Sequence, residues 1–323
     1  MINPMWAKAP EINKQLEDVQ AILLQRVDQL NDPMATLVKK QVVSGGKMIR
    51  PVCLLVFSSF GNASYETRIQ GAAAMEILHL ATLMHDDVID DSNLRRNVET
   101  VQVKLGDRNA IYAGDYLMTV YFEIVSNISN SRSEIVLNAF SMEKILRGEL
   151  DQLLINNNVN ATVKMYLREV AGKTAQLIEL SAQYGALLTN ADSLIVHHAR
   201  FIGHNLGMAF QIQDDILDYL GNKKTGKPQL EDLKNGVYTI PLIFALENSS
   251  GDLRDFLTDK KQLTEAEITY VAQQVVELGG IAAAQDLASK YSQKALRLID
   301  ELPQTKYAHL MKWVVEKLLK RQQ

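Results

Sequence analysis

The stretch I-L-H-L-A-T-L-M-H-D-D-V-I-D-D (residues 77–91) joins an apolar run to a cluster of four aspartates. Its apolar residues recur at spacings of three and four, which predicts an α-helix that ends in the acidic cluster. Carboxylates next to a hydrophobic core cost free energy unless they are paired or bind a metal. The stretch therefore predicts a long helix whose aspartates need a partner.

The same helical spacing extends through most of the chain. Proline is absent from residues 52–227, and the sequence shows no sustained strand alternation, solenoid repeat or low-complexity linker. We therefore expect an all-α fold in which a single domain spans residues 1–323. Loops are expected at 44–47, 61–64, 156–160 and 221–236. Helices are expected at 11–30, 34–43, 47–60, 66–92, 109–128, 132–155, 162–187, 191–220, 237–248, 264–278, 281–300 and 305–320.

The composition is that of an ordinary globular protein, with 47% hydrophobic and 22% charged residues. A formal net charge of −4 argues against a nucleic-acid-binding protein. No apolar stretch reaches the roughly 20 residues of a membrane span. Cys53 is the single cysteine, so an internal disulfide is excluded, and residues 1–10 lack the layout of a signal peptide. We expect a cytoplasmic protein with at most peripheral membrane contact.

The aspartate pattern occurs twice, at 86–91 and again as D-D-I-L-D at 214–218. On a helix, Asp86 and Asp90 would share one face, and Asp87 and Asp91 would form a second such pair. One such motif is more often a solvated helix end, but two copies favour a divalent-cation site. Mg²⁺ prefers a few carboxylates together with phosphate oxygens, so the predicted ligand is a phosphate ester. If the two helices face each other, the expected oxygen donors are Asp86, Asp90 and Asp214, with Asp87, Asp215 and Asp218 in addition.

Cationic residues suited to such a ligand flank both aspartate clusters. Each of them alone is more often a surface charge. Together they predict two anionic groups, one held through Mg²⁺ and another held directly by Arg and Lys side chains. These residues are Lys47, Arg50, Arg95, Arg96, Lys173 and Lys227.

Seven motifs resemble, in consistent order, those of the trans-isoprenyl diphosphate synthases, the polyprenyl synthetase family. The similarity is closest to the large (component II) subunits of bacterial heptaprenyl and hexaprenyl diphosphate synthases. This resemblance implies an isoprenoid-synthase-type helical bundle around a deep central cavity, and either a homodimer or a heteromer with a small regulatory subunit. The motifs are G-G-K-x-I-R-P (45–51), H-D-D-V-I-D-D followed by R-R (85–96), G-D-Y (114–116), G-E-x-x-Q (148–152), K-T-A (173–175), F-Q-I-x-D-D-I-L-D (210–218) and G-K-P (226–228).

The resemblance also implies a reaction. An allylic diphosphate (geranyl, farnesyl or geranylgeranyl) would condense with isopentenyl diphosphate by Mg²⁺-dependent ionisation, condensation and elimination. The product would be a medium- or long-chain all-trans polyprenyl diphosphate, used for quinone side chains. The alternatives are a geranylgeranyl diphosphate synthase, or a subunit that is inactive without a small partner. A terpene cyclase is disfavoured by the second aspartate motif, and a squalene-type synthase by the absence of a dinucleotide-binding fingerprint.

By position, the resemblance assigns roles to individual residues. One residue departs from the family pattern, because Val237 stands where Lys is frequent. The expected catalytic residues are Asp86, Asp87, Asp90, Lys173 and Asp214, of which Asp86, Asp90 and Asp214 would hold three Mg²⁺ ions, with Asp87 and Asp218 supporting. The expected contacts to the allylic diphosphate are Arg95, Lys173, Thr174, Gln211 and Lys227. The expected contacts to isopentenyl diphosphate are Lys47, Arg50, His79 and Arg96.

Product length should depend on the helix that precedes Asp86, along which the growing chain would descend. Thr82 and Ala81 lie about one helical turn, or roughly 6 to 7.5 Å, deeper and are both small. Leu78 and Met75 follow and could form the floor. This pattern predicts a product longer than farnesyl. The structural alternative is that the small residues only allow close helix packing.

Overall fold

The structure, a computed structural model, describes residues 2–221, 230–258, 260 and 262–319. These residues are helical apart from loops and one hairpin, in which β1 (Leu94–Arg95) pairs antiparallel with β2 (Val98–Glu99). The prediction of an all-α fold is confirmed. Within the described ranges, no helix is both long enough and apolar enough to cross a lipid bilayer.

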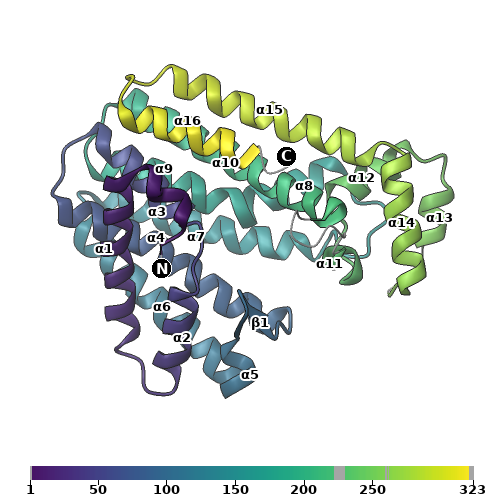
Figure 1. The fold of residues 1–323 in the computed structure, drawn as a ribbon, viewed down its shortest axis with the longest axis horizontal. Coiled ribbons are helices and arrows are strands. Elements are labelled where there is room, and N and C mark those ends of the chain that lie inside the picture. Colours follow the sequence, from purple (N-terminus) through teal and green to yellow (C-terminus); the bar gives the residue numbers. More distant parts are fainter. Residues whose placement is uncertain (1, 222–229, 259, 261, 320–323) are drawn as a thin grey trace. The chain divides into compact units, whose positions relative to one another are not determined.

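The chain divides into two compact units (Figure 1). Unit 1 comprises Met1–Ala139 and Leu180–Arg200, and unit 2 comprises Phe140–Glu179 and Phe201–Gln323. Helices α7 (Arg132–Gln152), α9 (Gln176–Leu188) and α10 (Ser193–Leu220) supply residues to both. The organisation as one domain stays a prediction, and each unit is described by itself below.

Unit 1 is organised around α4 (Tyr65–Ile89), whose first turn is capped by the Ser64 hydroxyl, which accepts a hydrogen bond from Thr67 N at 3.0 Å. Helix α6 (Asp107–Ile128) packs along it. A Cβ on Gly114 of α6 would lie 2.3 Å from His85 Nε2, so only glycine lets the imidazole approach α6 this closely. The other elements of unit 1 are η1 (Pro4–Lys8), α1 (Pro10–Val27), α2 (Met34–Val43), α3 (Ile49–Phe57), η2 (Ser58–Phe60), β1, β2 and α5 (Val101–Leu105).

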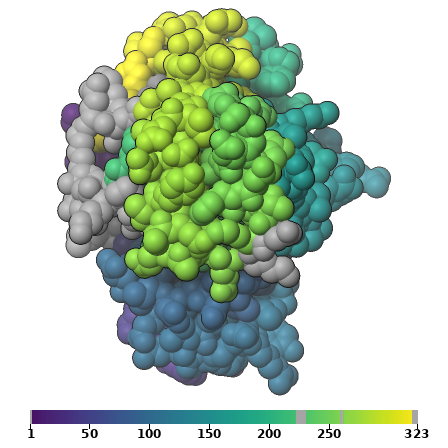
Figure 2. Space-filling view, turned by 90° about the vertical axis from the view of Figure 1, so that its right-hand side faces the viewer, coloured from purple at the N-terminus to yellow at the C-terminus, as the bar shows by residue number. Residues whose placement is uncertain are grey.

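Unit 2 has its own apolar core, to which α8 (Val163–Val170) and α10 contribute residues such as Tyr166, Ile212 and Ile216. The helices of residues 252–300 form a continuous green to yellow-green surface in Figure 2. The elements that lie wholly in unit 2 are α8 (Val163–Val170), the π-helix η3 (Ala171–Ala175), α11 (Glu231–Lys234), α12 (Ile240–Asn248), α13 (Asp252–Leu257), α14 (Glu265–Glu277), α15 (Gly280–Asp300) and α16 (Lys306–Leu319).

The first aspartate helix ends earlier than predicted. Helix α4 stops at Ile89, Asp90 is its C-cap residue, and Asp91 has a left-handed φ of 48°. Ser92 N donates to Asp87 O at 2.9 Å, which closes the helix end. The prediction that Asp87 and Asp91 form a second pair on one helix face is therefore wrong, because the chain has already left the helix.

Candidate active site

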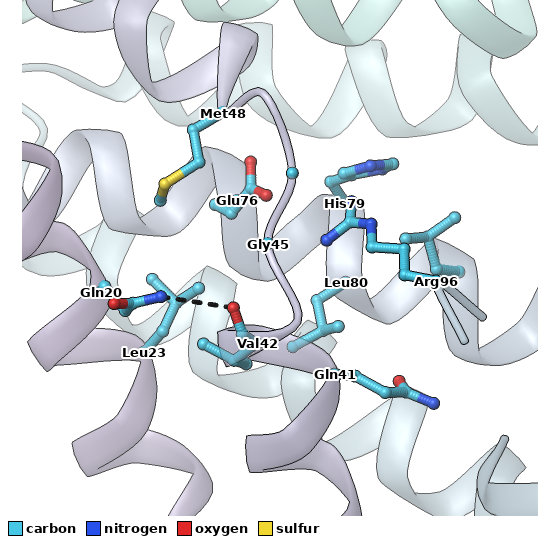
Figure 3. Close-up of a pocket in the computed structure, with 12 residues that line it drawn as sticks. Gln20, Leu23, Gln41, Val42, Gly45, Met48, Glu76, His79, Leu80 and Arg96 are labelled. Carbon is cyan, nitrogen blue, oxygen red and sulfur yellow. Dashed lines mark hydrogen bonds between the residues drawn. The ribbon is translucent and has the colours of Figure 1, made fainter. Parts of the chain in front are cut away.

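Unit 1 contains a pocket of about 440 Å³ beside the G-G-K loop (residues 45–47). Figure 3 shows Glu76 next to the loop at Gly45, with His79 and Arg96 close to each other on one side. Arg96 comes from the turn of the β-hairpin, and the other two side chains come from α4. The pocket thus brings together two of the four residues predicted to hold isopentenyl diphosphate, His79 and Arg96. The other two, Lys47 and Arg50, lie in the adjoining loop and the first turn of α3.

The charge around this pocket is mainly positive. Burial lowers the pKa of His79 well below its ordinary value, and Arg50, Arg96 and Arg95 lower it further, so the imidazole is neutral. Burial also lowers the pKa of Arg50, whose buried Nε has no hydrogen-bond partner among the described residues. A guanidinium with an unpaired buried donor is suited to an anionic ligand such as a phosphate.

Glu76 is a pocket residue that the motifs did not identify. Burial raises the pKa of its carboxyl group, while the charges of Arg50 and Arg96 oppose that rise. One carboxyl group near two guanidinium groups leaves the pocket with excess positive charge. A signal was present in the sequence, because Glu76 precedes His79 by three residues and so shares its side of the helix.

The first aspartate cluster lies at the C-terminal end of α4, two turns beyond His79. Asp86 follows His79 by seven residues, which corresponds to roughly 10 Å along the helix and about 20° around it. Asp87 is only 1% exposed, and Arg95 Nε donates to its Oδ1 at 2.9 Å. Its Oδ2 is buried and has no hydrogen-bond partner in the part of the chain that the structure describes. Arg95, predicted to bind a diphosphate, is therefore paired with a carboxylate here.

The second aspartate cluster lies near the end of α10 in unit 2. Asp215 Oδ2 accepts a hydrogen bond from Tyr166 at 2.6 Å, and its Oδ1 accepts one from Gln211 at 2.8 Å. Asp218 Oδ1 accepts from Glu231 N at 3.1 Å. Asp215 thus bonds to α8, and Asp218 bonds to the backbone of α11. Burial raises the pKa of Asp214 to about 7, and a bound cation would offset that effect.

Three predicted diphosphate contacts meet in unit 2. Lys173 comes from the π-helix η3, and such bulges are frequent at functional sites. Its Nζ donates to Gln152 Oε1 at 2.7 Å and pairs with Glu149 Oε2 at 2.8 Å. Thr174 Oγ1 donates to Gln211 Oε1 at 2.9 Å. Lys227, the remaining predicted contact in this part of the chain, lies outside the described residues.

Lys173 and Gln211 line a pocket of about 390 Å³ in unit 2. Asp232 and Glu169 also line it, and the motifs identified neither of them. Burial, followed by the charge of Asp215, raises the pKa of Glu169 to about 8 and that of Asp232 to about 7. Val237 adds an apolar wall at the position where Lys is frequent in the family that the motifs resemble.

The predicted product-length residues lie on α4. Met75, Leu78 and Ala81 are buried in unit 1, and Thr82 Oγ1 donates to His79 O at 2.9 Å. Their role in product length stays a prediction.

The aspartates suit a hard cation in their chemistry, since all are oxygen donors and Asp87 retains an unpaired buried oxygen. In the part of the chain that the structure describes, no three His, Cys, Asp or Glu side chains are grouped closely enough to hold a metal ion by themselves. Mg²⁺ sites commonly combine a few carboxylates with water and substrate phosphate oxygens.

Residues 30–277 match the sequence model of the polyprenyl synthetase family. The chain belongs to this family. It is accordingly a trans-prenyltransferase of the polyprenyl diphosphate synthase group, whose members use isopentenyl and allylic diphosphates and depend on Mg²⁺. The predicted enzyme class is confirmed.

Relatives within the polyprenyl synthetase family differ in the product that their names state. Component 2 of heptaprenyl diphosphate synthase from Geobacillus stearothermophilus is 35% identical over 303 residues, 93% of this chain and 94% of that protein. The structure of geranylgeranyl pyrophosphate synthase from Lactobacillus brevis superimposes with a TM-score of 0.92 at 42% identity, covering 98% of this chain and 99% of that one. A polyprenyl synthase from Caulobacter crescentus, whose structure contains calcium and isoprenyl diphosphate, has a TM-score of 0.87 at 28% identity and covers 95% of both chains.

Proposed function

We propose that this enzyme adds isopentenyl diphosphate to an allylic diphosphate and releases an all-trans polyprenyl diphosphate longer than farnesyl. The allylic C–O bond ionises, the isopentenyl double bond attacks the carbocation, and a proton leaves to form the new double bond. The released diphosphate accepts this proton, because none of the motif side chains is an obvious general base of suitable pKa.

One observation carries the proposal: in unit 1, the single helix α4 contributes residues that we assign to each of the two substrates. His79 of α4 lines the cation-rich pocket, and Asp86 follows two turns later on nearly the same face. An isopentenyl diphosphate bound at the pocket would thus lie beside an allylic diphosphate bound at the aspartates. Such alignment supplies much of the rate enhancement in two-substrate reactions.

The residues divide between the two substrates. The reacting carbon atoms must be kept from water, because water would quench the cation. Bound Mg²⁺, three ions by analogy with the family, would supply electrostatic stabilisation of the leaving diphosphate. We assign the ions to Asp86, Asp90 and Asp214, with Asp87 as a supporting residue through its contact with Arg95. The allylic diphosphate is assigned to Arg95, Lys173, Thr174, Gln211 and Lys227, and isopentenyl diphosphate to Lys47, Arg50, His79 and Arg96.

Two product classes have support from the relatives. The 35% identical heptaprenyl diphosphate synthase component favours a medium-chain product, and the 42% identical structure favours geranylgeranyl diphosphate. Small side chains at Ala81 and Thr82 are compatible with both, since neither blocks the first turn below Asp86. We propose the medium-chain product as the principal one, with quinone side chains as its use in the cytoplasm.

A second copy of the chain or a small subunit is the proposed partner. Helix α6 exposes the large apolar side chains Ile111, Tyr112 and Phe122, and such surfaces commonly mark protein contacts. Light scattering of the purified protein distinguishes a dimer from a monomer.

The test is incubation of the purified chain with farnesyl diphosphate, labelled isopentenyl diphosphate and Mg²⁺, followed by product-length measurement. Labelled products longer than farnesyl support the proposal, and the Asp86→Ala variant should lose turnover at saturating Mg²⁺. Release of a hydrocarbon without label incorporation would instead identify a terpene cyclase. If the chain binds both diphosphates but incorporates no label, it requires a partner subunit.

A further inference from the structure

Trp6 contacts the G-G-K loop from a distant part of the sequence. Its indole Nε1 donates a hydrogen bond to Lys47 O at 2.9 Å, across 41 residues. The side chain is fully buried, at 0% exposure, and belongs to η1, which packs on α1. A buried indole N–H needs an acceptor, and a loop carbonyl needs a donor, so this bond satisfies both groups.

The loop needs such support because its backbone is unusual. Gly45 has a φ of 89°, and Met48 has a φ of 48°. A left-handed conformation costs an ordinary residue such as methionine roughly 1 kcal/mol. Lys47 lies between these two positions, and surrounding contacts must therefore keep its backbone in place.

Arg96 makes the second contact to this loop. A Cβ on Gly46 would lie 2.7 Å from Arg96 Nη2, so the guanidinium rests directly against the loop backbone. Gly46 and Arg96 both line the unit 1 pocket. The bond from Trp6 and the contact with Arg96 thus act on neighbouring residues of one loop.

We propose that Trp6 is a positioning residue for isopentenyl diphosphate, acting through the backbone of Lys47. This inference rests on the proposed function, which assigns Lys47 and Arg96 to that substrate. Trp6 has no role in the ionisation of the allylic diphosphate, and its substitution therefore changes the binding of one substrate only.

The first test is steady-state kinetics of Trp6→Phe, which keeps an aromatic side chain and removes the N–H donor. Loss of one such bond predicts a KM for isopentenyl diphosphate raised about three- to tenfold. Turnover and the KM for farnesyl diphosphate should stay within about twofold of the wild type. A purely structural residue would lower the active fraction and leave this KM unchanged, and that result would overturn the inference.

Trp313 provides the matched control, because it is the other tryptophan of the chain and lies on α16 in unit 2, where Lys317 stacks over its ring at 4.9 Å. Trp313→Phe should leave both KM values unchanged. The variant Lys47→Ala tests the assignment of Lys47 to isopentenyl diphosphate independently of the role of Trp6. If this variant has a normal KM for isopentenyl diphosphate, the assignment of Lys47 fails; if it has a raised KM and Trp6→Phe does not, only the inference fails.

A second measurement applies if Trp6→Phe does not fold. In the Trp313→Phe variant, Trp6 is the single tryptophan and its fluorescence reports on the loop. Isopentenyl diphosphate added without allylic substrate should change this emission saturably, with a midpoint near its KM. Unchanged emission under conditions where calorimetry detects binding would overturn the inference.

Discussion

Arg95 Nε donates a hydrogen bond to Asp87 Oδ1 at 2.9 Å, and this links the β-hairpin to the last turn of α4. The carboxylate is nearly inaccessible, whereas the Arg95 side chain is 30% exposed. Burial raises the pKa of Asp87, and the charge of Arg95 opposes that rise. The pair therefore fixes the hairpin turn that carries Arg96 into the pocket.

Replacement of Arg95 should destabilise the protein because it leaves a buried carboxylate without its donor. We expect Arg95→Gln to lower the free energy of unfolding by about 1–3 kcal/mol, measured by urea denaturation at pH 7. Arg147 is the matched control, since its side chain is 72% exposed and pairs with Glu143 on one face of α7. Arg147→Gln should cost no more than about 0.5 kcal/mol. Equal losses in the two variants would contradict a structural role of the Asp87 pair.

The hydrogen bond from Tyr166 to Asp215 offers a second comparison at constant geometry. Tyr65 donates to Asp18 over the same distance, 2.6 Å, but its side chain is half exposed. Tyr166→Phe should lower the free energy of unfolding by about 1.5–3 kcal/mol, because the bond is buried and charge-assisted. Tyr65→Phe should change it by less than about 1 kcal/mol, because water replaces the lost donor. Thermal denaturation of both variants measures the difference, and a larger effect at Tyr65 would refute this account.

His79 should contribute to the pH dependence of stability. Its pKa is lowered in the folded protein, so near pH 6 the unfolded chain binds more protons, and stability falls as pH drops below about 6.5. The groups that act on its pKa are Arg50, Arg95 and Arg96, with Glu76 one turn away. Between pH 7.5 and 5.5 the wild type should lose about 1 kcal/mol more than His79→Gln. The free energy of unfolding of both proteins at the two pH values tests this, and identical losses would show that His79 titrates normally.

Cys53 should be chemically inert in the folded enzyme. It is fully buried in α3, and burial raises the pKa of its thiol to about 12, so the reactive thiolate is scarce at pH 8. A colorimetric disulfide reagent should detect about one thiol per chain in denaturant and almost none in buffer within an hour. Because Cys53 is the single cysteine, the readout has no background from other sites. Fast labelling of the native protein would mean that α3 opens readily.

The long helices could be predicted because their apolar spacing repeats over several turns. Helix α2 has the predicted bounds, 34–43, and α10 begins two residues later than predicted and ends where expected. The short helices α5, α11 and α13 and the β-hairpin were not predicted, and α11 lies within the loop that was expected at 221–236. Elements of so few residues have little periodicity, and most of their stability comes from tertiary contacts.

The motifs did not identify every residue that lines the two pockets or contacts the G-G-K loop. Glu76 and Asp232 line the pockets and Trp6 donates to Lys47 O, but none of the three belongs to a motif. The backbone of the π-helix also lies directly against α7, since a Cβ on Gly148 would lie 2.2 Å from Lys173 N. No local pattern encodes such an approach of two backbones.

The sequence by itself determined the helical class, the two aspartate clusters and the family, because these depend on periodicity and on residue types at fixed spacing. The tertiary structure decided which carboxylates are already bonded. Asp87 pairs with Arg95, Asp215 binds Tyr166 and Gln211, and Asp218 accepts backbone N–H groups. The physical reason is that desolvation and hydrogen bonding depend on neighbours brought together by folding. The residues of the two aspartate motifs do not specify which side chains those neighbours are.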